Sequence, residues 1–206
     1  MAKKEVIKVK KLEKGETFIK VSAPWFNQAS AATEQSPSER IRWCVKALSK
    51  DETRVVRLLY IDETYIVATD GNRMHITWND YGYSPGLYHV LLSNSKQIIL
   101  ERDGDLDLKD YPKFEKVIPE KCTNGIGPFS YPQVGSKYGY KAVLSQYFHH
   151  VFTSTGKCYN IQFLEDALAR DSEHQFQVAD ATRHNKMLVV GIEDCNRLAL
   201  IMPLAN

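Results

Sequence analysis

The chain has 206 residues, enough for one large domain or two small ones with a real hydrophobic core. Its composition, 43% hydrophobic and 25% charged, excludes global disorder, and a net charge of +2 does not by itself indicate a nucleic-acid partner. No apolar run approaches the ~20 residues that span a bilayer, and the N-terminal lysines are not followed by an apolar secretory segment. We therefore expect a cytoplasmic protein with no membrane partner.

Residues 1–22 are predicted to form a basic arm or an edge strand. Lysines crowd the first fourteen residues, and stretches such as Phe18–Val21 alternate between apolar and polar residues. Lys8, Lys10 and Lys11 either contact nucleic-acid phosphates or, in the plainer interpretation, face water and protect a sheet edge from aggregation. Residues 23–37 are rich in Ala, Ser and Gln and are predicted to be a loop.

A helix is predicted from Pro37 to about Ser49, because Ser36–Glu39 combines a capping serine, a proline at the first helical position and a glutamate three residues after the cap. Apolar residues recur at helical spacing on one face. Arg42 and Lys46 lie four apart on another face, with Arg40 at the start of the helix. A basic face of this kind either contacts DNA or is simply solvated, and the residues do not decide between the two.

The remainder is predicted to be strands with two further helices. The strands are Arg54–Tyr60, Tyr65–Trp78 with a turn at Asp70-Gly71, Leu87–Leu92, Gln97–Glu101, Phe176–Ala181, Met187–Ile192 and Arg197–Met202. The helices are Tyr140–Val151 and Ile161–Arg170, the second capped by Asn160. Ser93–Leu100 also fits a single helical turn. Residues 120–139 contain several glycines and are predicted to be a loop.

The cysteines and acidic residues form no metal-ligand pattern. The cysteines are far apart and make no CxxC pair, so we expect reduced and mostly buried thiols: Cys44, Cys122, Cys158 and Cys195. Asp103, Asp105 and Asp107 alternate, but Leu108 and Phe114 stand where an EF-hand loop needs Gly and Glu. We predict no metal site and no cofactor.

Three separated segments carry the functional signal. They are Tyr65–Ile76 (YIVATDGNRMHI), Tyr111–Pro119 (YPKFEKVIP) and LALIMPL, which ends at Leu204. In the first, a β-branched strand breaks at Asp70-Gly71 and resumes with Arg73 and Met74. A strand that turns sharply and leaves an arginine beside a methionine forms a short groove wall with a polar rim.

These segments, in this order, resemble the bacterial DNA polymerase III beta subunit, the sliding clamp, whose strand-turn ATDGHRL is close to ATDGNRM here. The resemblance implies an α+β fold of the DNA-clamp (processivity-fold) type, with βαβββ halves and helices packed on one side of antiparallel sheets. We expect a composite domain over residues 23–206, with halves at about 16–92 and 157–204 and an insertion at about 93–156. Two abbreviated domains, 1–120 and 121–206, are the alternative.

The resemblance also implies a pocket that binds short linear peptides where the three segments converge. Carried over position by position, its residues are Arg73, Met74, Pro112, Val117, Leu200, Met202, Pro203 and Leu204. Such a pocket accepts apolar anchors of an extended peptide, and methionine walls adapt to different partners. The plainer interpretation is that these residues belong to the core. Asn72 replaces the family's usual histidine, and Ala205-Asn206 replaces its usual basic and apolar end.

Three functions follow as hypotheses. The first is a non-enzymatic processivity factor or tether that binds a DNA polymerase or another replication protein, contacts double-stranded DNA, and forms a homo-oligomer. The second is a clamp-like module that sequesters or redirects clamp partners without encircling DNA. The third is an enzyme, for which no activated nucleophile or acid–base pair is present. Asp70 beside Arg73 is a candidate catalytic carboxylate, but an aspartate at this place in a turn more often caps the backbone.

Overall fold

The computed structural model describes residues 18–22, 37–95, 97–119, 122–130, 137–168, 173–179, 186–192 and 197–205. The helices are α1 (Pro37–Val45), α2 (Lys137–Thr155) and α3 (Ile161–Ala167), with 3-10 helices η1 (Val55–Arg57), η2 (Leu108–Asp110) and η3 (Phe114–Val117). The strands are β1 (Phe18–Ser22), β2 (Leu59–Ile61), β3 (Tyr65–Thr69), β4 (Arg73–Trp78), β5 (Gly86–Ser93), β6 (Gln97–Arg102), β7 (Cys122–Ser130), β8 (Glu173–Ala179), β9 (Leu188–Ile192) and β10 (Arg197–Ile201).

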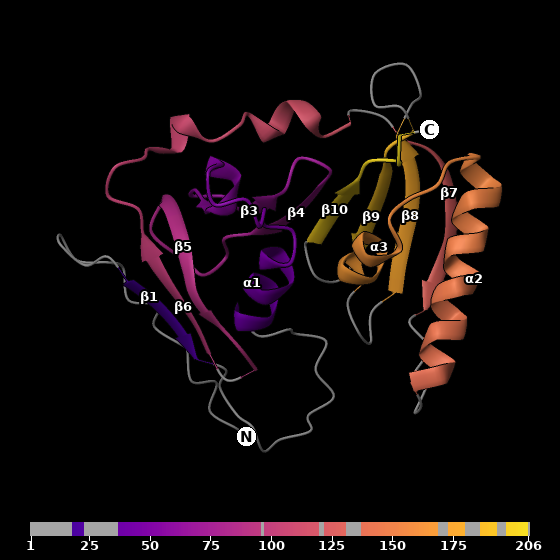
Figure 1. Ribbon diagram of the computed structural model, residues 1–206, viewed down its shortest axis with the longest axis horizontal. Helices are drawn as coiled ribbons and strands as arrows, with labels where there is room; N and C mark the ends of the chain where they lie inside the picture. The colour runs from indigo at the N-terminus through magenta and orange to yellow at the C-terminus, as the bar shows by residue number, and fades with distance from the viewer. Residues whose placement is uncertain are drawn as a thin grey trace.

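Within these residues the strands form one ten-stranded sheet, in the order β1-β6-β5-β2-β3-β4-β10-β9-β8-β7, with every pair antiparallel. The chain passes twice through a strand, helix and three-strand order, first as β1-α1-β2-β3-β4 and later as β7-α2-α3-β8-β9-β10 (Figure 1). The two passes meet where β4 pairs with β10, with Thr77 opposite Arg197 and Arg73 opposite Ile201. The predicted α+β class with antiparallel sheets is confirmed.

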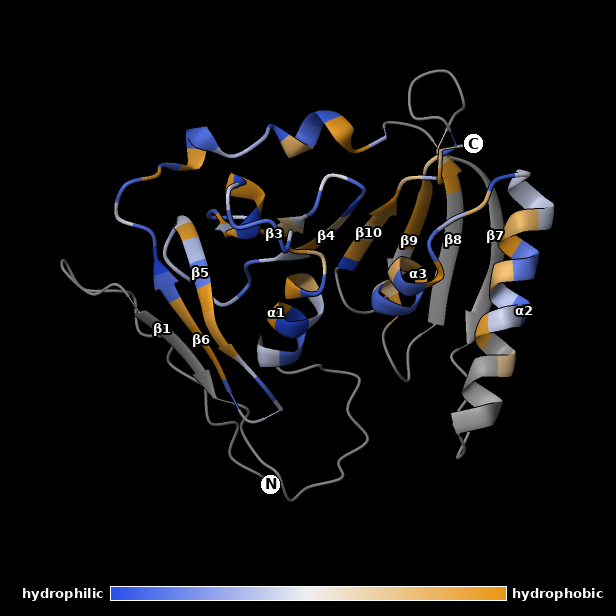
Figure 2. Ribbon diagram, in the orientation of Figure 1, coloured by the Kyte–Doolittle hydropathy of each residue, from blue (hydrophilic) through white to orange (hydrophobic). Residues whose placement is uncertain are grey.

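Side chains of the strands alternate between two cores, because successive residues of a strand point to opposite faces of the sheet. Ile66 and Ala68 of β3 lie in one core together with buried residues of all three α-helices, whereas Val67 between them lies in the other. Leu188 and Val189 of β9 divide in the same way. All three helices therefore contribute to the core on one face of the sheet. Figure 2 shows apolar stretches along β5, β6, β9 and β10.

The opposite face is covered by the segment that carries η2 and η3, which runs along the upper edge of the sheet in Figure 1. Tyr111 and Phe114 of this segment pack on Tyr60, each with ring centroids 5.2 Å apart, and both are nearly inaccessible to solvent. The aromatic contacts hold the segment against the second core. They also place Tyr111–Pro119 beside the β3–β4 turn.

The prediction of a loop at 120–139 is wrong, because this segment contains β7 and the start of α2. β7 lies at the edge of the sheet and pairs with β8, with register shifts between Thr123 and Ile126 and between Ile126 and Phe129. Glycine and proline are tolerated on edge strands and at such irregularities. Pairing with β8 therefore outweighs the weak strand propensity of the local sequence.

Two other boundaries differ from the prediction. Arg54–Tyr60 begins with η1 rather than a strand, and only Leu59–Ile61 pairs in the sheet. α1 ends at Val45, not near Ser49, since the chain tightens there into a hydrogen bond from the Leu48 N–H to the Val45 carbonyl.

The structure also decides two further predictions, one for the segment Ser93–Leu100 and one for the start of α3. Gln97 begins a strand, so the alternative of a helical turn over Ser93–Leu100 is wrong. The cap of α3 is confirmed: Asn160 Oδ1 accepts a hydrogen bond from the Gln162 N–H at 2.9 Å.

Candidate functional site: a pocket at the β4–β10 junction

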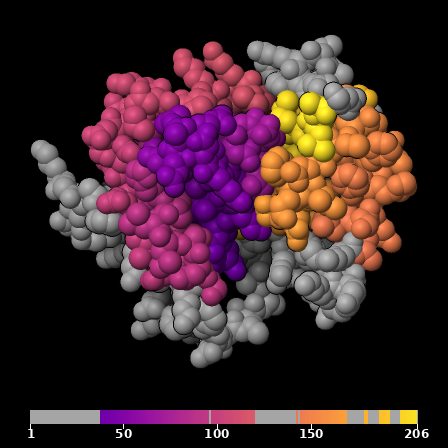
Figure 3. Space-filling view, viewed as in Figure 1, coloured from indigo at the N-terminus to yellow at the C-terminus, as the bar shows by residue number. Residues whose placement is uncertain are grey.

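A pocket of about 370 Å³ lies where the β3–β4 turn, the end of β10 and the segment carrying η3 meet. Six of the eight residues predicted from the sequence line it: Arg73, Met74, Pro112, Val117, Leu200 and Met202. The other lining residues are Arg54, Val56, Thr69, Gly71, Asn72, Lys113, Phe114 and Met187. Figure 3 shows the C-terminal residues, in yellow, between the indigo-to-magenta first part of the chain and the orange second part.

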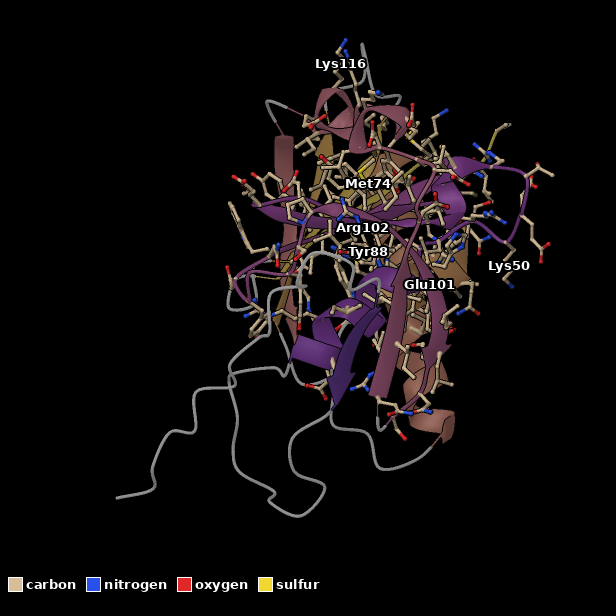
Figure 4. The ribbon with its side chains drawn as sticks, turned by 90° about the vertical axis from the view of Figure 1, so that its left-hand side faces the viewer. Lys50, Met74, Tyr88, Glu101, Arg102 and Lys116 are labelled. Carbon is tan, nitrogen blue, oxygen red and sulfur yellow. The ribbon has the colours of Figure 1, made fainter. Side chains whose placement is uncertain are left out.

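The floor of the pocket is apolar and largely buried. Met74 and Leu200 face each other across the β4–β10 pair and expose 6% and 1% of their surface. Met187 and Phe114 close the sides at 1% and 2%. Figure 4 shows Met74 inside the molecule, below the segment whose Lys116 points outward at the top. A dry floor with an exposed Val117 at its edge suits an apolar side chain inserted from outside.

The β3–β4 turn is held by its own side chains. Asp70 Oδ1 accepts hydrogen bonds from the N–H groups of Asn72 and Arg73 at 2.9 and 3.0 Å. Gly71 has φ +94°, a conformation that favours glycine. The Met202 N–H donates to the Asn72 carbonyl at 2.8 Å, which fixes the C-terminal wall against the turn. These bonds give Asp70 a structural role in the turn.

Arg73 borders the pocket, but its guanidinium lies on the helix side of the sheet. Nε donates to Asp70 Oδ2 at 3.0 Å, and Nη1 donates to Asp166 Oδ2 at 2.6 Å. Nη2 donates to the Lys46 carbonyl at the end of α1, and the guanidinium stacks 4.3 Å from the Phe163 ring centroid of α3. Neighbouring residues of a strand point to opposite faces. Met74 therefore supplies the side chain that faces the pocket, and Arg73 ties the sheet to the helices.

Pro203 and Leu204 are not among the residues that line the pocket. The Leu204 N–H donates to the Cys158 carbonyl at 2.8 Å, and its side chain is 48% exposed. Sequence reasoning missed Met187, although its place just before the strand that pairs with β10 could have indicated it. It also missed Phe114, which stands inside the YPKFEKVIP segment itself, and Arg54, for which no sequence signal exists.

Both arginines of α1 that were predicted to bind DNA, Arg40 and Arg42, have protein partners. Arg40 Nη1 forms an ion pair with Asp80 at 2.7 Å, and Arg42 Nη1 donates to the Asn94 carbonyl at 2.7 Å. Lys46 is exposed at the end of α1. Lys8, Lys10 and Lys11 lie outside the described residues.

Among the residues that the structure describes, no group of three His, Cys, Asp or Glu side chains could hold a metal ion. Burial raises the pKa of the Cys44 thiol, which donates to the His75 carbonyl at 3.1 Å, whereas Cys158 is exposed. None of the helices described is both long enough and apolar enough to cross a bilayer.

A solved structure described as a DNA polymerase III beta subunit, from Eubacterium rectale, aligns with this chain at a TM-score of 0.53 and 11% identity, covering 94% of this chain and 66% of the other. The protein has the sliding-clamp fold. The DNA polymerase sliding clamp from Bacillus subtilis aligns at a TM-score of 0.49 and 12% identity, with 82% of this chain and 62% of that chain covered. The DNA polymerase III subunit beta from Pseudomonas aeruginosa aligns at 0.48 and 12%, with 93% and 67% covered.

The chain spans about two thirds of the length of the clamps that it resembles. It spans 62% of the Bacillus subtilis clamp and 66% of the Eubacterium rectale protein. By sequence, no family model and no curated protein matches it. The likeness thus lies in the fold.

Proposed function

We propose that the protein is a non-catalytic, sliding-clamp-like tether of DNA replication or repair. It binds a polymerase or another replication protein through a linear motif that enters the pocket at the β4–β10 junction. The observation that carries the proposal is the pocket itself, in which six residues chosen from three separated segments meet around an apolar floor. An extended peptide that inserts one or two apolar side chains is the ligand this shape fits.

The pocket is tested by peptide binding to a wall variant. Met202 is half-buried and Val117 is 38% exposed, so Met202→Ala with Val117→Ala removes wall atoms at little cost to folding. We expect a fluorescent peptide with a leucine and a phenylalanine anchor to bind the wild type and to lose at least about fivefold in affinity in this variant. Leu91→Ala, at an exposed position of β5, is the matched control and keeps full affinity. Equal affinity in all three proteins would remove the pocket from the proposal.

A second candidate is a clamp-like module that binds clamp partners without DNA. The partners of Arg40 and Arg42 favour it, because phosphate contacts by these side chains would have to replace bonds to Asp80 and Asn94. Salt-dependent binding of duplex DNA separates the two candidates: a tether releases counterions and loses affinity steeply with salt, and a module shows no such binding. Light scattering measures the molar mass in solution and so gives the number of subunits, which matters because encircling DNA requires a closed oligomer.

A further inference from the structure

Lys186 is held in a backbone conformation that lysine rarely adopts. Its φ is +60°, and among the described residues it is the only one other than glycine with a positive φ. Such a conformation persists where the surrounding structure holds it, and residues of this kind gather at functional sites. Lys186 immediately precedes Met187, which is buried and lines the pocket. The strained backbone therefore stands next to a wall of the pocket.

The side chain of Lys186 is tied to the C-terminal end of α2. Its Nζ donates a hydrogen bond to the Thr155 carbonyl at 2.8 Å, and Thr155 is the last residue of the helix. The last carbonyls of a helix lack intrahelical donors and carry partial negative charge, so an ammonium is a favourable partner. Thr155 is buried, and its hydroxyl donates to the Val151 carbonyl at 2.8 Å. The acceptor of the lysine is therefore fixed in position.

The backbone of Lys186 and Met187 is held from two further sides. The hydroxyl of Tyr159, a buried residue between α2 and α3, donates to the Lys186 carbonyl at 2.5 Å. The Ala179 N–H, at the end of β8, donates to the Met187 carbonyl at 2.9 Å. Contacts from α2, from the α2–α3 connection and from β8 thus converge on two consecutive residues.

The same end of the molecule also holds the chain beside a second methionine of the pocket. The Leu204 N–H, two residues after Met202, donates to the Cys158 carbonyl at 2.8 Å. Figure 1 shows the last turn of α2 and the C-terminus of the chain at the same end of the sheet. The connection that follows α2 therefore contacts the residues next to both pocket methionines.

We propose that Lys186 is a positioning residue, which directs Met187 into the pocket through its bond to the end of α2. The proposal rests on the peptide-binding function above and adds the element that shapes one wall of the site. A methionine side chain is flexible, so its place in a wall depends on a fixed backbone. The bond from Nζ to the Thr155 carbonyl offsets the unfavourable φ of residue 186. Loss of the ammonium frees residue 186 to relax and Met187 to move with it.

The test follows the methionine methyl signals by NMR together with peptide binding. Lys186→Leu removes the ammonium at a half-buried position, whereas Lys186→Arg keeps a donor that can reach the Thr155 carbonyl. In Lys186→Leu we expect a displaced or broadened Met187 signal and an unchanged Met74 signal. The affinity for the peptide with leucine and phenylalanine anchors should fall about three- to tenfold. Lys186→Arg should restore both the Met187 signal and the affinity, which a general loss of stability does not explain.

Lys157→Leu is the matched control, because Lys157 carries the same charge but bonds to Thr155 through its backbone, and both readouts should keep their wild-type values. Tyr159→Phe is a second variant. It removes the bond to the Lys186 carbonyl, keeps the buried ring and should also displace the Met187 signal. Unchanged Met187 signals in both Lys186→Leu and Tyr159→Phe would overturn the positioning role. A displaced Met187 signal in a protein whose wild type binds no peptide would support the positioning role and remove the peptide-binding function.

Discussion

The two faces of β4 differ in chemistry, because alternate residues of the strand are polar on one face and apolar on the other. Arg73, His75 and Thr77 are buried on the helix side, where the first two make defined polar contacts. Met74 and Ile76 belong to the core on the other side, where the pocket opens. The polar row fixes the sheet against its helices, and the apolar row leaves a shaped, adaptable surface. Neighbouring residues of one strand thus supply the ties to the helices and the lining of the pocket.

The largest expected loss of stability comes from a substitution of Arg73 on the polar face of β4. Arg73→Met keeps the length of the side chain but leaves Asp70 and Asp166, both largely buried, without their cation. Removing one partner of a buried ion pair costs about 3–5 kcal/mol, and we expect a loss of that size in urea unfolding. Lys109→Met, which breaks an exposed pair, is the control and should leave the midpoint unchanged. A loss at position 73 as small as that of the control would mean that the helix-side network does not hold the fold.

A pH-dependent effect is expected at His75. Its Nδ1 lies 2.8 Å from the Trp43 carbonyl and its ring stacks on Trp43, and burial lowers the pKa of the imidazole to about 3. The unfolded chain, with a histidine pKa near 6.5, binds more protons than the native state between about pH 6.5 and 3. The unfolding free energy should therefore fall by about 1.4 kcal/mol per pH unit as the pH drops through this window.

His75→Phe isolates this contribution, since it keeps an aromatic ring against Trp43 and removes the titration. At pH 7.5 the variant should be less stable because the hydrogen bond to the Trp43 carbonyl is lost. The difference should close as the pH falls toward 4.5. A constant difference between the two unfolding curves across this range would show that His75 is not held neutral by burial.

The smallest expected loss of stability is at α3, whose Asp166 and Phe163 contact Arg73 on the helix side of β4. Asn160→Ala removes the side-chain cap that accepts from the Gln162 N–H. The expected cost is about 1 kcal/mol in unfolding free energy, with no change in peptide affinity because α3 contributes no pocket residue. Gln162→Ala is the control, because the backbone N–H of residue 162 can still donate to the Asn160 side chain. Altered peptide affinity in Asn160→Ala would mean that the two faces of β4 are coupled.

Much of the site could be predicted because its signals are local. The turn at Asp70-Gly71, the aromatic and proline segment and the strand before Met202 each have a sequence signature, and the fold brings them together. The direction of each side chain is harder to predict than its position. Arg73 and Met74 both border the pocket, but the Arg73 guanidinium lies on the helix side of the sheet and Met74 belongs to the core on the other side. Only the structure shows that Arg73 finds Asp166, ninety-three residues away, on the helix side.

Other elements could not be predicted because tertiary pairing outweighs local propensity. β7 contains Gly125, Gly127 and Pro128, and it is a strand because β8 offers an edge to pair with. Arg54 stands at the start of η1, which replaces the first part of the expected strand, and it lines the pocket. Its Nη1 donates to the Asp70 carbonyl at 3.2 Å, a contact that no local sequence pattern indicates.

The most direct test of the pocket is methyl NMR of the protein labelled at its four methionines. Met74, Met187 and Met202 line the pocket. We predict that the peptide with leucine and phenylalanine anchors shifts the methyl signals of these three methionines in a saturable way. Binding that shifts none of the three would place the peptide elsewhere and contradict the account.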